Sequence, residues 1–139
     1  MRMIHPLILI FAALLTLTGC AGNQKEIDAL ADEIYQSHRL KPPLPPKPFV
    51  SDGCSLWPDS GWLECCVEHD LVYWKGGAGQ DRLEADRMLK TCVSKKAGPF
   101  WGTVMYHGAR VGGAWWLPTP FRWGFGWEYP RSGPPGSRD

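Results

Sequence analysis

One stretch of the chain decides its fold: Cys65-Cys66-Val67-Glu68-His69-Asp70-Leu71-Val72-Tyr73. At helical spacing, Cys65, His69 and Tyr73 share one face, while Cys66 and Asp70 share the neighbouring face. A histidine can act as a general base near neutral pH, and an adjacent carboxylate can bind a hard cation. Two neighbouring cysteines can link one helix to two other segments. The stretch therefore predicts a cross-linked helix that supports hydrolysis with the help of a metal ion.

The first 19 residues have the features of an export signal. Arg2 provides a positive charge, and the run at residues 7–17 is almost wholly apolar but too short to span a bilayer comfortably. The run ends in Leu17-Thr18-Gly19-Cys20, which resembles the bacterial lipobox, in which the cysteine is lipidated and becomes the new N-terminus. The alternative is an ordinary signal peptide with a chance cysteine. We expect a signal peptide at 1–19 and a lipid anchor on Cys20.

The cysteine count agrees with this interpretation. The sequence has five cysteines, an odd number that is unusual for an exported protein. Removing Cys20 leaves Cys54, Cys65, Cys66 and Cys92, and an oxidising compartment permits disulfides between them. Neighbouring cysteines cannot easily reach disulfide geometry with each other. Cys65 and Cys66 should therefore each pair with either Cys54 or Cys92, which leaves two pairings open.

Charge and length limit the class of protein. Without the leader, the chain carries as many acidic residues as lysines and arginines, and it has no basic stripe of the kind that nucleic-acid binding needs. We therefore expect no nucleic-acid partner. A mature chain of about 120 residues with two disulfides can bury one modest core, so we expect a single domain.

Four segments have helical patterns, and together they predict an all-α fold: residues 25–38, 62–74, 82–95 and 100–115. The third segment should begin with a capping box, in which Asp81 is the N-cap and Glu84 lies three residues on. The apolar positions of the first segment recur at helical spacing: Ile27, Leu30, Ala31 and Ile34. The positions expected to be buried in the third are Leu83, Asp86, Leu89, Cys92 and Val93. In the fourth segment, one face carries Trp101, Val104, Gly108, Val111 and Trp115.

The remaining segments give the domain organisation. Residues 20–48 should contain the lipidated N-terminus, the first helix and a proline-rich connector at 41–48, which is extended and could alternatively bind a partner module. Residues 49–117 form the expected core. Residues 118–139 are an irregular tail rich in proline, glycine and aromatic residues, which could pack on the core or lie at a membrane interface.

The glycine turn at 76–79 should fold the third helical segment back antiparallel to the second. Cys65 lies about 6 Å from His69 towards the N-terminus of its helix, and Cys92 lies about 9 Å from Asp86 towards the C-terminus of the other. In an antiparallel pair these directions coincide. A bridge between Cys65 and Cys92 would therefore place Asp86 beside His69.

This juxtaposition has a chemical use. Asp86 would accept a hydrogen bond from one ring nitrogen of His69 and so fix its tautomer. The other nitrogen could then take a proton from water. Tyr73, one turn beyond His69, could hydrogen-bond to Asp86 and hold it in place.

The remaining disulfide would place a loop beside the second acid. If Cys66 pairs with Cys54, the loop at 51–61 lies near Asp70. Asp70 would then offer carboxylate oxygens to a hard cation, and backbone carbonyls around Gly53 and Ser55 would complete the ligand set. Calcium suits such an all-oxygen site best, and it can polarise an ester carbonyl.

Two segments of the sequence resemble a known protein family. Cys-Cys-x-x-His-Asp-x-x-Tyr at 65–73 is similar to the active-site helix of the secreted phospholipases A2, and Ala85-Asp86-Arg87 followed by Cys92 resembles their second core helix. The resemblance covers residues 52–93, and the loop looks more like that of compact bacterial members. It implies the pairs Cys65–Cys92 and Cys54–Cys66. It also implies the following roles: His69 as base, Asp86 as its partner, Tyr73 as support, and Asp70 as calcium ligand.

The chain also departs from the family pattern. The usual calcium loop is longer and richer in glycine, whereas residues 56–59 here read Leu-Trp-Pro-Asp. Val72 stands where the family usually has a cysteine, and the hairpin between the helices is reduced to the glycine turn.

The resemblance implies calcium-dependent hydrolysis of a phospholipid acyl ester, which would make the chain a carboxylic ester hydrolase acting at the membrane that holds its anchor. Ala21 lacks the acidic signal that retains some lipoproteins at the inner membrane, so we expect the bacterial outer membrane, facing the periplasm. An envelope protein is a further candidate partner. The alternative function is a non-catalytic lipoprotein of the same fold with a lipid-binding or structural role.

A zinc site could be built from cysteines and a histidine, but export and the spacing disfavour it: Cys65, Cys66, His69 and Cys92. His107 and Arg110, in the fourth helical segment, belong to no recognisable motif, and we expect both to lie at the surface or at an interface.

Overall fold

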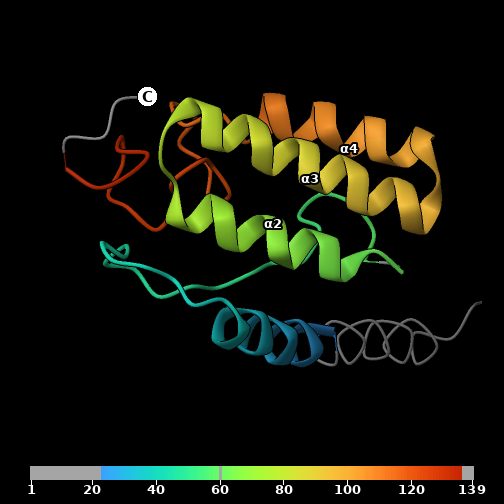
Figure 1. The fold of residues 1–139 in the computed structure, drawn as a ribbon, viewed down its shortest axis with the longest axis horizontal. Coiled ribbons are helices and arrows are strands. Elements are labelled where there is room, and N and C mark those ends of the chain that lie inside the picture. Colours follow the sequence, from blue (N-terminus) through green and yellow to red (C-terminus); the bar gives the residue numbers. More distant parts are fainter. Residues whose placement is uncertain (1–22, 60, 136–139) are drawn as a thin grey trace, which may run out of the picture.

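The computed structural model of this chain describes residues 23–59 and 61–135, and within them every regular element is a helix. Residues 23–37 are helical, and they are followed by α2 (Leu63–Lys75), α3 (Gly79–Ala97) and α4 (Pro99–Gly112). Figure 1 shows that α3 runs antiparallel to α2 and that α4 runs antiparallel to α3. This confirms the all-α prediction.

The expected signal peptide at 1–19 and the expected lipid anchor on Cys20 lie outside the described residues. Across the ranges that are described, no helix combines the length and the apolar character needed to cross a membrane.

One face of α2 packs on the helix at 23–37. Val67, Leu71 and Trp74 of α2 form a buried cluster with Ala31 and Ile34. The stripe at Ile27, Ala31 and Ile34 is buried as its spacing indicated. Burying apolar side chains stabilises such a contact by roughly 25 cal/mol per Å² removed from water.

The opposite face of α2 packs on α3 and α4 and carries both disulfides. The structure joins Cys65 to Cys92 and Cys54 to Cys66, which is the pairing that the resemblance implied. The cysteines pack with three buried side chains from α3 and α4: Leu89, Val93 and Met105. The first bridge therefore connects two core helices, and the second fixes the loop at 51–59 to α2.

The start of α3 differs from the prediction. The helix begins at Gly79, and its N-cap is Ala78 rather than Asp81. Asp81 lies inside the first turn, where its Oδ2 accepts a hydrogen bond from the Ala78 N–H at 2.9 Å. A carboxylate in the first turn can satisfy a free N–H at the helix end as effectively as one at the N-cap. Asp81 therefore does belong to the start of the helix, but the predicted N-cap lies three residues too late.

The orientation of α4 does not follow its bulky residues. The buried residues of the helix are Gly102 and Met105, whereas Trp101 is 37% exposed and Val111 is 74% exposed. A Cβ atom at Gly102 would collide with the Lys90 carbonyl oxygen of α3. The small residue therefore sets the rotation of the helix by allowing close backbone contact, and the bulky residues beside it turn outward.

The C-terminal tail completes the end of α2. The last carbonyls of a helix have no partner within it. Three donors of the tail bond to them: the Gly124 N–H to Tyr73 O at 2.7 Å, the Gly126 N–H to Trp74 O at 3.1 Å and the Trp127 indole to Lys75 O at 2.7 Å. Gly76, which has a φ of 65°, lies against this tail, and a Cβ atom there would collide with the Ser132 carbonyl oxygen.

A buried arginine holds the tail in its looped shape. The Arg122 guanidinium donates hydrogen bonds to three backbone carbonyls: Trp123 O at 3.0 Å, Trp127 O at 2.7 Å and Arg131 O at 2.6 Å. Trp123 and Trp127 are 1% and 7% exposed, so both are packing residues. Trp116 and Tyr129, by contrast, are more than half exposed.

The proline-rich connector lies along this same region. The Trp74 indole donates a hydrogen bond to Lys47 O at 2.8 Å, and the Lys47 N–H donates to Gly126 O at 3.3 Å. Pro45 is buried. The connector therefore packs on α2 and the tail.

We expect the Cys65–Cys92 bridge to contribute much of the stability of the helix pair. Replacing both residues by serine removes a cross-link over 27 positions, and loop entropy gives a loss of roughly 3–4 kcal/mol in the free energy of unfolding. Denaturant unfolding of the oxidised protein measures this loss. Peptide mass mapping checks the pairing itself, and a peptide that joins Cys65 to Cys54 would contradict it.

Candidate functional site

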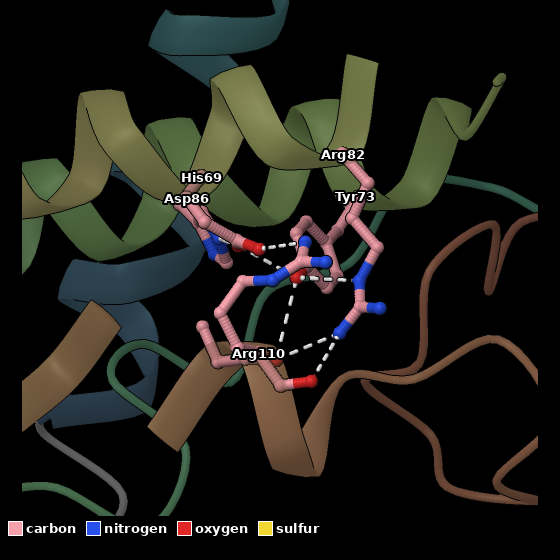
Figure 2. A network of polar contacts seen from close by, with 6 residues as sticks. His69, Tyr73, Arg82, Asp86 and Arg110 are labelled. Atoms are coloured by element: carbon pink, nitrogen blue, oxygen red, sulfur yellow. Dashed lines mark hydrogen bonds and ion pairs between the residues drawn. The ribbon is translucent and has the colours of Figure 1, made fainter. Parts of the chain in front are cut away.

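The centre of the candidate site is a histidine–aspartate pair between α2 and α3. His69 Nε2 donates a hydrogen bond to Asp86 Oδ1 at 2.8 Å, and the Tyr73 hydroxyl donates to the same oxygen at 2.7 Å (Figure 2). The three side chains therefore lie together, as expected from the antiparallel arrangement. Nδ1 of His69 has no protein partner within the described ranges, so it is the ring nitrogen available for proton transfer.

Two arginines that the sequence analysis did not assign to the site belong to this network. Arg110 of α4, whose side chain is 31% exposed, donates from Nη1 to Asp86 Oδ2 at 2.7 Å, a partner that the sequence did not indicate. Arg82 of α3 is buried and donates from Nε to the Tyr73 hydroxyl at 3.2 Å. His107 is exposed, as expected. No local motif marked either arginine, because their contacts are made between helices rather than along one helix.

Arg82 also caps α4. Its Nη2 donates to the carbonyl oxygens of Ala109 at 3.1 Å and Arg110 at 2.6 Å, in the last turn of that helix. A positive charge at a helix C-terminus is stabilised by the unpaired carbonyls and the helix dipole. These carbonyl oxygens explain how the guanidinium of Arg82 is accommodated in the interior.

The environment of Asp86 favours its charged form. The side chain is fully buried, and burial by itself raises the pKa of Asp86. Hydrogen bonds from His69, Tyr73 and Arg110 outweigh this effect and hold the pKa of Asp86 below its usual value. Burial and the neighbouring Asp86 carboxylate raise the pKa of Tyr73, so its hydroxyl remains a donor.

Asp70, the expected metal ligand, lies in the opposite environment. Burial raises the pKa of Asp70 well above its usual value. The hydrogen bond from the Ser51 hydroxyl to Oδ2, at 2.6 Å, lowers that pKa, while the neighbouring acids Asp52 and Asp59 raise it further. Ser51 is itself buried, and no sequence motif singled it out. The charges acting on this carboxylate are thus negative, which is the setting in which a cation is most strongly attracted.

The loop at 51–59 contacts Asp70 through Ser51 and contains the two other expected ligands. Gly53 and Ser55 line the same cavity as Asp70, and both have a positive φ, 75° and 55°. The Ser55 hydroxyl bonds to Asp52 at 3.0 Å, and Asp59 Oδ1 accepts from the Cys54 N–H at 2.9 Å. One carboxylate with backbone carbonyls is an all-oxygen donor set that fits calcium.

Other metal sites fit less well. Within residues 23–59 and 61–135, no three side chains of histidine, cysteine, aspartate or glutamate come together to hold a metal. The zinc alternative is wrong for this structure, because Cys65, Cys66 and Cys92 are all in disulfides.

A cavity of about 320 Å³ lies between Asp70 and His69. It is lined by His69 and Asp70 of α2, by the loop around Gly53 and Ser55, and by one side of α4. Most of its remaining wall is apolar: Leu56, Trp57, Leu89, Met105, Ala109 and Phe121. A mainly apolar cavity with a few polar groups at one end is typical of a binding site for a largely hydrophobic molecule.

Comparisons of this chain with protein-family models, with curated proteins and with solved structures found no match. Any function proposed for it therefore comes from its own residues.

We expect the stability of the protein to fall in acid through Asp86. Because its folded pKa is lowered, the stabilisation from ionised Asp86 is present above the ordinary carboxyl pKa of about 4 and is lost as the pH falls through the folded value. Asp86→Asn should lose about 1–3 kcal/mol at pH 7 and show a weaker acid dependence. Denaturant unfolding over a pH series measures both effects. Asp32→Asn, at an exposed position, is the matched control.

Proposed function

We propose that this protein hydrolyses an acyl ester of a phospholipid with the help of calcium. The single observation that carries the proposal is the paired and oriented His69, with Nδ1 free, in one apolar cavity with Asp70. The resemblance of residues 65–73 to the secreted phospholipases A2 supports the same function.

His69 is the general base in this mechanism. Asp86 accepts a hydrogen bond from Nε2–H and so keeps Nδ1 unprotonated, and Nδ1 can then remove a proton from a water molecule that attacks the ester carbonyl. The imidazolium that forms lies against the ionised Asp86, which stabilises its positive charge. Tyr73 donates to Asp86 and keeps the carboxylate in position.

Asp70 and backbone oxygens of Gly53 and Ser55 are the proposed calcium ligands. When bound there, calcium would polarise the ester carbonyl and stabilise negative charge on its oxygen. The Ser51 hydroxyl donates a hydrogen bond to Asp70 Oδ2 and so restrains one oxygen of the carboxylate. The apolar wall of the cavity would receive part of an acyl chain and exclude water from it.

A second function is supported by the loop. Asp59 and Ser55 are both engaged in hydrogen bonds within the loop at 51–59, and the Ser51 hydroxyl already bonds to Asp70. Such a loop could be stable without a metal, and the cavity would then bind lipid without cleaving it. This would be the non-catalytic lipoprotein that the sequence also allows.

We expect acyl release from mixed micelles to require both His69 and calcium. His69→Gln should lower kcat by at least about a hundredfold, because general-base catalysis typically contributes that much. Addition of a chelator should have a similar effect on the unmodified protein. The measurement is fatty acid released from a defined phospholipid.

The matched control is His107→Gln, which changes an exposed histidine of α4 and should leave the rate unchanged. Activity that persists in His69→Gln, or in the presence of chelator, contradicts the mechanism. A folded protein without activity at saturating calcium favours the lipid-binding function.

We expect calcium to raise the melting temperature through Asp70. At ten times its Kd, a ligand of the native state alone adds about 1.4 kcal/mol. Since the raised pKa of Asp70 disfavours its charged form in the folded state, Asp70→Asn should be more stable than the unmodified protein at pH 7 in chelator. The same variant should not respond to calcium, whereas Asp32→Asn should respond fully. Calcium stabilisation that survives in Asp70→Asn would place the ion elsewhere.

A further inference from the structure

A closed ring of hydrogen bonds connects the last turn of α4 to the histidine–aspartate pair. Tyr73 donates to Asp86 Oδ1, and Arg82 donates to Tyr73. Arg82 also holds the Arg110 carbonyl oxygen at 2.6 Å, and the Arg110 side chain returns to Asp86 Oδ2 at 2.7 Å. Figure 2 shows these groups converging from three helices around the Asp86 carboxylate.

Each oxygen of Asp86 has a different partner. Oδ1 accepts hydrogen bonds from His69 and Tyr73, and Oδ2 accepts one from Arg110. The terminal torsion of an aspartate is broad, so a carboxylate that is held through one oxygen alone can rotate away from its partner. Arg110 places a charged donor on the second oxygen, so the carboxylate is held through both oxygens and cannot rotate without breaking this bond.

We propose that Arg110 is a positioning residue for His69. It holds Asp86 in the orientation that keeps the Nε2 proton of His69 bonded, so that unprotonated Nδ1 is presented to the cavity. Arg82 assists by fixing the backbone of Arg110. This inference rests on the proposed function for its catalytic meaning, but the tautomer of His69 can be measured whether or not the protein is an enzyme.

The first experiment measures that tautomer in the full chain. Nitrogen NMR at about pH 9, where a histidine is ordinarily neutral, distinguishes Nε2–H from Nδ1–H, and His69→Gln identifies the signals by their loss. The unmodified protein should show almost only the Nε2–H form. In Arg110→Gln the Nδ1–H form should rise about fivefold, as expected when one hydrogen bond of ordinary strength is weakened.

The matched control is Arg87→Gln, which removes an exposed arginine next to Asp86 in sequence and should not change the tautomer. If Arg110→Gln does not fold, Arg110→Lys replaces it, because lysine keeps the charge without a rigid plane of donors. A smaller shift of the same sign is then expected. An unchanged tautomer in the folded variant overturns the proposal.

The second experiment tests the catalytic consequence. In Arg110→Ala, kcat should fall about tenfold while KM stays within about twofold, as for an interaction that acts on the chemical step. Added guanidinium, at concentrations that do not unfold the protein, should restore several-fold activity, and sodium at equal ionic strength should not. A merely destabilised protein would lose further activity in guanidinium, which would overturn the proposal. A shifted tautomer in a protein without any activity would support Arg110 as a positioning residue while contradicting the proposed function.

Discussion

The buried carboxylate of Asp86 is the constraint on which the arrangement of the core helices depends. An isolated ionised group in the interior is strongly unfavourable, so its partners must be present together. Asp86 belongs to α3, its partners His69 and Tyr73 belong to α2, and Arg110 belongs to α4. The three helices therefore cannot slide or rotate against one another without exposing or unpairing this charge. The same contacts that fold the core orient the imidazole.

Asp70 and Asp86 show how one residue type acquires two properties from its surroundings. Both are buried, but Asp86 has three donors whereas Asp70 has the hydroxyl of Ser51 and two neighbouring acids. The pKa of one is lowered and that of the other is raised. A pair of carboxyl groups with pKa values displaced in opposite directions is characteristic of a site that divides its chemistry between two acids.

The features that could be predicted from the sequence are those set by spacing along one helix. His69 and Tyr73 are one turn apart, and a bridge from Cys65 to Cys92 is enough to bring Asp86 to them. Arg110 could not be found in this way, because its position depends on the rotation of α4. That rotation is set by the close contact of Gly102 with α3, a packing property that the pattern of bulky residues conceals. Ser51 was missed because its role depends on how a loop closes on Asp70.

The hydrogen bonds that the tail gives to α2 affect the order in which the protein matures. The Trp127 indole reaches back 52 positions to the carbonyl of Lys75, at the end of the helix that carries His69. During synthesis, residues appear from the N-terminus onward. The helix therefore exists first with a frayed end and is completed only after residue 127 has been made. A product cut short before Trp123 would carry every residue of the histidine–aspartate pair on an unfinished scaffold.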